Sequence, residues 1–358
     1  MAVMFRFLIT VRPLGLLYGS AGAFLSPENL VGRSGAKFPP DAATLSGLFL
    51  STNREKPFTD HQELKMNLTI AGAFWSKDEN LRDGDFYVPI PRSLIIDQKK
   101  TDQWEIKEGK WHRPKKDEDI DATYTWQKIS SWGKSIDLVR KNGVSEVPWK
   151  FVPMLHPTLD PDQRNVRSPV ADNDRGSLFL ENAVQMRQDS CLVYLSTHSI
   201  PEGWYRFGGE NHLVEIGRQS IDSNISDLLN KPIHKSFALI CPAVWGSNNL
   251  SCRYPTDLRF SNKRPEMLTD RPVPFRHRIV KSNDEKQQTN KLSIGRYAVP
   301  TGTVYLLKHP LDEKYDNWWK FPHEWFPHSK KQLPIDQRAL PLKHLGYGLC
   351  LPIDIKGA

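Results

Sequence analysis

The residues best suited to chemistry lie between positions 203 and 216, in the string GWYRFGGENHLVEI. It places Gly208 and Gly209 directly before Glu210, Asn211 and His212, and a strand-like alternation comes next. A Gly-Gly step lets backbone approach a phosphate closely, and a Glu-His pair could move a proton. The same step is also a common way to turn a hairpin or form a bulge. The string alone leaves all three interpretations open.

A second group of reactive side chains is the stretch from Arg253 to Lys281. It carries eight Lys or Arg residues against Asp257, Glu266 and Asp270, with aromatic residues and prolines among them. Basic residues interleaved with aromatic ones suit a surface that grips a single-stranded backbone and stacks bases. A solvated, charged loop is the alternative.

The whole chain has 358 residues and a formal net charge of +8, which makes a polyanionic partner plausible without establishing one. Its 27 prolines and 22 glycines favour short strands and irregular loops over long helices. The four cysteines are scattered, without a CxxC pair or a histidine at metal-ligand spacing. We therefore expect reduced, buried thiols, no metal and no cofactor.

The apolar N-terminus is interrupted by Arg12 and Pro13, and the uncharged stretch after these two residues is too short to span a bilayer. We interpret residues 4–13 as a strand, and expect a cytoplasmic protein without a targeting or membrane segment. Residues 41–53 predict a helix with Asp41 as N-cap, since Leu45, Leu48 and Phe49 share a face.

Further strands are expected at 68–76, 85–96, 177–187, 190–198, 236–245 and 294–308, with a last strand after a Gly-Tyr-Gly loop. This sheet-rich order with one early helix predicts an α+β fold. Residues 97–170 are charged, with isolated tryptophans and few aliphatic side chains. We expect them to be an insertion that protrudes from the core and whose tryptophans act as packing anchors.

Six strings occur in an order that matches a known family. They are FPPDAATLSGLF, AGAFWS with DFYVPIPR, GGENHLVEI, ALICPAVW, RYAVPTGTVYLL and GYGLCLPI. Together they resemble RAMP-superfamily subunits of type III-B (Cmr) CRISPR–Cas effector complexes, and within these the third protein of the module, which caps the 5′ tag of the guide RNA. Residues 97–170 and 281–291 are not covered by the resemblance.

The resemblance implies two ferredoxin-like (RRM-like) β-α-β-β-α-β domains with insertions, at residues 1–200 and 201–358. It also implies a non-catalytic, RNA-binding structural subunit in antiviral defence. The implied partners are the crRNA 5′ tag, the large cyclase-bearing subunit, the backbone RAMP subunits and, indirectly, target RNA. In that family the Gly-Gly-Glu string belongs to the signature of the second domain, so the opening motif would lie close to the RNA.

Single-stranded RNA recognition needs stacking surfaces, donors and cations. The expected RNA-binding residues fall in four segments: Tyr18, Arg33 and Lys37; Arg206, Gly208, Gly209, Asn211 and His212; Arg259, Lys263, Arg264, Arg271, Arg276, His277 and Arg278; and Lys343, His344, Gly346, Tyr347 and Gly348. The last segment departs from the fuller glycine-rich loop of many RAMP proteins, and a simple turn is its alternative.

A rival hypothesis is a metal-independent endoribonuclease that processes guide RNA, since some RAMP relatives cut RNA with a histidine base. His61, with Lys56 and Lys65 nearby, and His212 are the candidates. Eleven histidines are too many for any one to be diagnostic. A third hypothesis, a generic basic scaffold outside CRISPR biology, would make six ordered matches a coincidence.

Overall fold

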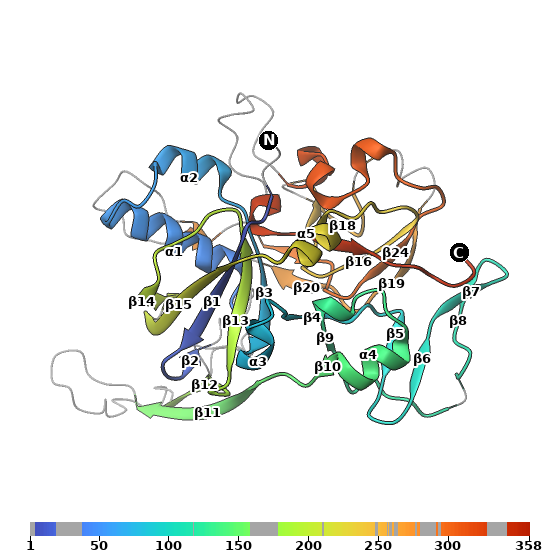
Figure 1. Ribbon diagram of the computed structural model, residues 1–358, viewed down its shortest axis with the longest axis horizontal. Helices are drawn as coiled ribbons and strands as arrows, with labels where there is room; N and C mark the ends of the chain where they lie inside the picture. Colours follow the sequence, from blue (N-terminus) through green and yellow to red (C-terminus); the bar gives the residue numbers. More distant parts are fainter. Residues whose placement is uncertain are drawn as a thin grey trace, which may run out of the picture.

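Two antiparallel sheets lie side by side in the computed structural model, each with its own set of connections (Figure 1). The structure describes residues 4–18, 38–116, 118–157, 178–209, 211–247, 250–255, 257, 260, 264–275, 278–279, 291–292, 295–327 and 342–358. The mixture of antiparallel sheets with a few short helices confirms the predicted α+β class.

The first sheet is built around β1 (Phe7–Pro13), β3 (Ile70–Lys77), β13 (Ser190–Ser196) and β15 (His212–Ser220). Their order across the sheet is β3-β13-β1-β15, and every neighbouring pair is antiparallel. In chain order, the first and third of these strands, β1 and β13, are central. The second and fourth, β3 and β15, lie outside them. This is the ferredoxin-like order that the sequence resemblance predicts.

The connections of this sheet depart from the ideal pattern in one place. Helix α1 (Ala42–Glu55) joins β1 to β3 as expected, although the side chain of its N-cap residue Asp41 makes no capping hydrogen bond. The connection from β13 to β15 holds strand β14 (Gly203–Phe207), which pairs with β15 at the sheet edge, where the ideal fold has its second helix.

The two faces of the first sheet are set by the alternation of side chains along its strands. Ile9 and Val11 of β1 pack with Leu45 and Phe49 of α1, and all four are fully buried. Leu8, next to Ile9 on the strand, belongs to the cluster on the opposite face. One strand therefore supplies two cores, which explains why β1 is almost uniformly apolar.

The second sheet repeats the same strand order. It consists of β16 (Ser236–Leu239), β19 (Glu266–Leu268), β24 (Val304–Leu306) and β25 (Cys350–Pro352), arranged β19-β24-β16-β25. All three neighbouring pairs are antiparallel. Its second connection carries short 3-10 helices and no α-helix among its described residues.

The first sheet continues beyond the domain boundary expected after residue 200. Strands β14 and β15 lie in the predicted second domain, yet β15 is paired along its length with β1. The division between the two sheets falls after Ser220, where α5 (Ser223–Asn230) leads into β16. The Gly-Gly motif therefore belongs to the first unit, because the fourth strand of that unit comes directly after it.

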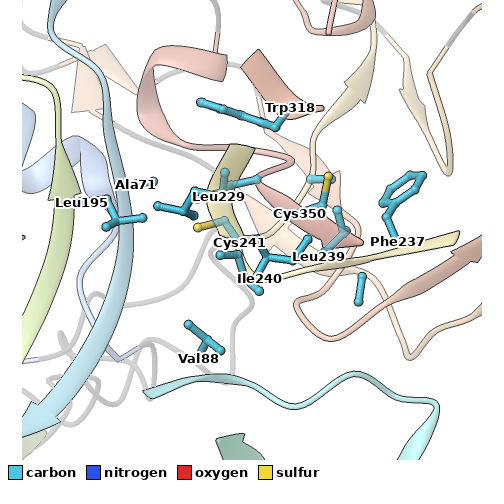
Figure 2. Packing of buried hydrophobic residues seen from close by; sticks show 14 of the residues in the cluster. Ala71, Val88, Leu195, Leu229, Phe237, Leu239, Ile240, Cys241, Trp318 and Cys350 are labelled. Atoms are coloured by element: carbon cyan, nitrogen blue, oxygen red, sulfur yellow. The ribbon is translucent and has the colours of Figure 1, made fainter. Parts of the chain in front are cut away.

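One continuous hydrophobic core joins the two units. Ala71 and Leu195 of the first sheet face Leu229, Ile240 and Cys241 of the second unit (Figure 2). All five are at most 3% exposed. Because this shared core is apolar and closely packed, we expect the two units to unfold together.

The segment 97–170 is more closely joined to the core than its composition predicts. Strand β9 (Trp126–Lys128) pairs with β4 (Tyr87–Pro89), which extends the first sheet to eight strands. The indole nitrogen of Trp132 donates to the carbonyl of Pro352 in the second unit over 2.8 Å. Residues 126–132 therefore belong to the main body and not to a separate, protruding insertion, and Trp132 is a packing anchor as expected.

A long hairpin of β11 (Trp149–Pro157) and β12 (Leu178–Met186) extends from the lower edge of the first unit (Figure 1). It forms a three-stranded sheet with β2 (Leu17–Tyr18). At its base, Trp75, Trp126 and Trp149 pack edge to face, with ring centroids 6.2–6.5 Å apart. These aromatic contacts fix the hairpin to the body of the protein.

The remaining elements are short. They are α2 (His61–Asn67), α3 (Asp78–Leu81), β5 (Leu94–Ile96), β6 (Thr101–Gln103), β7 (Glu105–Lys107), β8 (Lys110–His112), α4 (Ile136–Asn142), β10 (Val144–Ser145), β17 (Trp245–Gly246), β18 (Ser251–Cys252), β20 (Val273–Phe275), β21 (Arg278–Ile279), β22 (Lys291–Leu292) and β23 (Arg296–Ala298), with 3-10 helices at Ile129–Ser131, Glu313–Tyr315, Trp318–Lys320, His323–Trp325 and Leu342–Leu345. Within the described part of the chain, no helix is long and apolar enough to cross a bilayer.

Candidate nucleic-acid interface

Two segments that the sequence selected separately meet beside the long hairpin. The main-chain N–H of Tyr18 donates to Nε2 of His212 over 3.1 Å, and the two rings lie 5.3 Å apart. Nε2 must be unprotonated to accept this bond, so a neutral His212 carries its proton on Nδ1. The contact places the first loop and the Gly-Gly motif at one site.

A second histidine, which the sequence did not indicate, completes this group. His156 of β11 has its Nε2 3.5 Å from the hydroxyl of Tyr18, and Met154 Sδ lies 3.9 Å from the same hydroxyl. The ring of His156 meets that of Tyr18 edge on, with centroids 6.2 Å apart. Nothing in the sequence around residue 156 pointed to this position, because it depends on the register of β11 with β12 and β2. We call Tyr18, His156 and His212 the Tyr-His group.

The Gly-Gly step is the turn between β14 and β15. Gly208 has φ +76° and Asn211 has φ +57°, both in the left-handed region, and the Asn211 N–H bonds to the Gly208 carbonyl over 3.3 Å. Glycine and asparagine are the residues that tolerate this backbone conformation. The turn therefore accounts for Gly208 and Asn211, while Gly209 is exposed beside them. Glu210 lies outside the described residues.

Arg206 and His212 lie on opposite faces of this hairpin. Phe207 is paired with His212 and Arg206 with Leu213, and side chains alternate between faces along each strand. His212 is thus on the face of α1, whereas Arg206 is on the other face with Trp204. The Trp204 side chain is 72% exposed, and Leu213 and Leu14 are about half exposed. Nothing in the sequence assigns Trp204 to an exposed surface.

The terminal loop serves protein packing in this structure. Lys343 is 6% exposed, and its ammonium donates to the carbonyls of Trp319 and Phe321 over 2.8 and 2.6 Å. Burial lowers the pKa of Lys343 to about 8. Its bonds to two carbonyls favour the charged form, against that effect. Because this ammonium is buried and bonded to two carbonyls, it is not open to a phosphate in this conformation, and its contacts are internal ones.

The glycines of the same loop are used for close approach to protein rather than to RNA. A Cβ added at Gly346 would lie 2.5 Å from Cα of Ala71, and one at Gly348 would lie 2.6 Å from the ring of Trp245. Tyr347 is 3% exposed and packs on Phe275 with ring centroids 4.6 Å apart. The loop thus joins the second unit to strand β3 of the first.

The basic stretch is only partly described. Arg264 and Arg271 are exposed, as their predicted role requires. Its aromatic residues are in the core: Phe260 is 1% exposed against Trp325, and Phe275 is 3% exposed. Base stacking by these two rings is therefore ruled out in this conformation. Several predicted residues lie outside the described part of the chain: Arg33, Lys37, Arg259, Lys263, Arg276, His277 and the side chain of Arg278.

The catalytic candidates differ in their surroundings. His61 begins α2, and its Nδ1 lies 3.4 Å from the side-chain amide of buried Asn53, which holds the turn between α1 and α2. None of the described residues form a His/Cys/Asp/Glu group that could hold a metal ion. None of the four cysteines forms a disulfide bond. Burial raises the pKa of Cys241 to about 12, so this thiol is protonated at neutral pH.

Two consecutive units of ferredoxin-like strand order define the class of fold. No family model matches the chain, and no curated protein matches it. Among solved structures, it is similar to a chain of the type III-B Cmr-beta complex bound to cognate target RNA and AMPPnP, with 12% identity and a TM-score of 0.44, over 84% of this chain and 86% of that one.

Two further solved structures show the same kind of likeness. A chain of the Csm1–Csm4 cassette in complex with pppApA is 12% identical, with a TM-score of 0.42 and 99% coverage of both chains. A chain of the Csm3–Csm4 subcomplex of the type III-A CRISPR–Cas interference complex is 8% identical, with a TM-score of 0.35, over 87% of this chain and 96% of that one.

Proposed function

We propose that the protein is a non-catalytic, RNA-binding structural subunit of a type III CRISPR–Cas effector complex, and that it holds the 5′ tag of the guide RNA. The observation that carries the proposal is the contact between Tyr18 and His212. It joins two segments 194 residues apart in sequence, each of which the sequence alone selects as RNA-binding. The repeated ferredoxin-like order and the six ordered sequence strings support the same assignment.

The Tyr-His group has the chemistry of a site for single-stranded RNA. Tyrosine and histidine rings stack on bases, and hydroxyl and imidazole groups bond to base edges or to 2′-hydroxyls. The exposed turn at Gly208–Asn211 lies next to His212, where backbone can approach a phosphate. With a net charge of +8, the chain also has the long-range attraction that an RNA partner needs.

The proposed partners come from the same resemblance. They are the large cyclase-bearing subunit and the backbone RAMP subunits of the complex, with target RNA as an indirect partner, in cytoplasmic antiviral defence. We propose the III-B subtype on the sequence strings alone.

The test is binding of a labelled single-stranded RNA that carries the repeat-derived tag, compared with a scrambled tag. We expect Tyr18→Ala and His212→Ala each to weaken tag binding about 5- to 150-fold, since a stacked base is worth roughly 1–3 kcal/mol. Tyr297→Ala, at a half-exposed tyrosine on β23, is the matched control and should bind normally. Equal affinity of the wild type for both RNAs would contradict tag recognition.

A metal-independent ribonuclease is the second candidate, and the Tyr-His group is the observation that favours it. His156 and His212 both lie beside the Tyr18 ring, as a general base and a general acid would lie beside a scissile phosphate. The non-catalytic proposal expects tag RNA to stay intact in the presence of a chelator. Cleavage that disappears in both His156→Gln and His212→Gln would decide for the enzyme.

A further inference from the structure

A cavity of about 290 Å³ opens at the other end of β1 from the Tyr-His group. Its lining includes Arg6, Phe7, Glu63, Asn67 and His198. Phe7 and Pro13 are the two ends of β1, so roughly 20 Å of strand separates the cavity from the Tyr-His group. None of these residues belongs to the segments assigned to tag binding, so the cavity is a separate feature.

Hydrogen bonds hold the His198 ring in the wall of this cavity. Its Nε2 lies 3.1 and 3.2 Å from the two carboxylate oxygens of Glu63, which only accept. Its Nδ1 lies 2.8 Å from Oγ1 of Thr197, and that hydroxyl also lies 3.0 Å from the carbonyl of Asn67. His198 is thus hydrogen-bonded at both ring nitrogens, and its Nε2 engages Glu63.

Arg6 is the arginine that lines the same cavity. The backbone of Arg6 is held between β13 and β15, through bonds to Ser196 and Ile221 of 2.9 and 3.0 Å. Its side chain is exposed and makes no hydrogen bond or ion pair with any residue that the structure describes. A guanidinium on a fixed backbone, open to a cavity, is suited to bidentate binding of a phosphate.

Glu63 also keeps capacity to accept hydrogen bonds. Besides His198 it accepts from the amide of Asn67 over 3.3 Å, and its side chain is 47% exposed. The hydrogen bond from His198 lowers the pKa of Glu63, so it stays a carboxylate at neutral pH. A carboxylate with unused lone pairs beside a phosphate-binding arginine suits the hydroxyls of a ribose.

We propose that this cavity binds one ribonucleotide unit, with its phosphate on Arg6 and its ribose hydroxyls on Glu63. The cavity volume is at the small end of the range for ligand pockets, which fits a single nucleotide. The ligand can be a free mononucleotide or one nucleotide of a single-stranded RNA, because both present the same phosphate and ribose. The carboxylate predicts a preference for ribose over deoxyribose, since only ribose has the 2′-hydroxyl.

The test measures binding of AMP, dAMP and a short single-stranded RNA by the purified full chain. We expect AMP to bind more tightly than dAMP, and Arg6→Gln to weaken AMP binding at least about ten-fold. Glu63→Gln should reduce the preference for ribose. Arg187→Gln is the matched control, since Arg187 is an exposed arginine at the opposite end of β13, beside Asp189.

The outcomes distinguish a free mononucleotide from a nucleotide of RNA as the ligand. They also distinguish this proposal from the proposed function. AMP binding that depends on Arg6 identifies a free nucleotide, and RNA binding that depends on Arg6 without AMP binding identifies an RNA nucleotide. Binding that is unchanged in Arg6→Gln, or equal for AMP and dAMP, overturns the inference. Tyr18→Ala and Arg6→Gln should have independent effects, so loss of tag binding in Tyr18→Ala, together with AMP and RNA binding unchanged in Arg6→Gln, would leave the proposed function standing and overturn this site.

Discussion

Gly346 of the terminal loop lies against Ala71 of β3 so closely that a methyl group on Gly346 would come within 2.5 Å of the Ala71 Cα. Gly346 also has φ +73°, in the left-handed region. The two units of the protein therefore touch through a position where only a hydrogen atom fits.

Gly346→Ala should destabilise the protein by about 2–4 kcal/mol, from overpacking against backbone and from strain at a left-handed position. Thermal melting checks this. The matched control is Gly47→Ala, because Gly47 is exposed within α1 and has no atom within 4 Å of an added methyl group. There the same change should raise stability by up to about 1 kcal/mol. A Gly346→Ala variant that melts like the wild type would contradict the close contact.

His344 should make stability depend on pH. Burial, with help from the neighbouring charges of His323 and Lys343, lowers its pKa from 6.5 to about 4, and its Nδ1 lies 3.2 Å from the carbonyl of Leu68. Because the unfolded chain takes up this proton below about pH 6.5 and the folded chain only near pH 4, stability should fall as the pH drops through that window, by up to about 2–3 kcal/mol.

The check is denaturant unfolding between pH 7.5 and 4 in His344→Asn, whose amide can replace the Nδ1 donor without titrating. This variant should lose much of the acid dependence. His234→Asn, at an exposed histidine, should keep it. If both variants show the wild-type dependence of unfolding free energy on pH, protonation of His344 is not the cause of that dependence.

The Gly-Gly turn allows its structural and RNA-binding roles to be separated. Gly208→Ala should cost about 1–2 kcal/mol of stability, because Gly208 has φ +76°. Gly209→Val tests close approach to RNA, and should weaken tag binding while the melting temperature changes less than in Gly208→Ala. A Gly209→Val variant that melts early and still binds the tag at low temperature would show that the whole motif is only a structural turn.

The strands and the first helix could be predicted from sequence because their signals are local. The largely apolar run at residues 7–11 and the helical spacing of Leu45, Leu48 and Phe49 need no knowledge of the rest of the chain. The residues of the terminal loop could not be assigned in the same way. Lys343 and Tyr347 have the composition of a binding loop, and only their burial against the first unit shows that they pack.

The candidate site could be predicted only in part, because residue types are known from the sequence and strand register is not. Tyr18 and His212 were selected because of their residue types, yet their contact depends on the antiparallel register of β1 with β15. His156 and Trp204 were missed because a histidine or tryptophan in a strand gives no sign of which face it occupies until that register is known.

The segment 97–170 should be cut by proteases unevenly. Lys107 and Lys110 flank the exposed turn of the β7–β8 hairpin, whereas Lys128 is in β9 and is paired with Tyr87 of the main sheet. Cleavage needs local opening, which costs little in an exposed turn and much in a strand of the core sheet. Limited trypsin digestion with mass spectrometry should therefore find cleavage after Lys107 or Lys110 well before cleavage after Lys128. Trp132→Phe removes the indole bond to Pro352 and should bring the two rates closer together. Equal early cleavage at all three lysines in the wild type would show that this segment is a separate insertion after all.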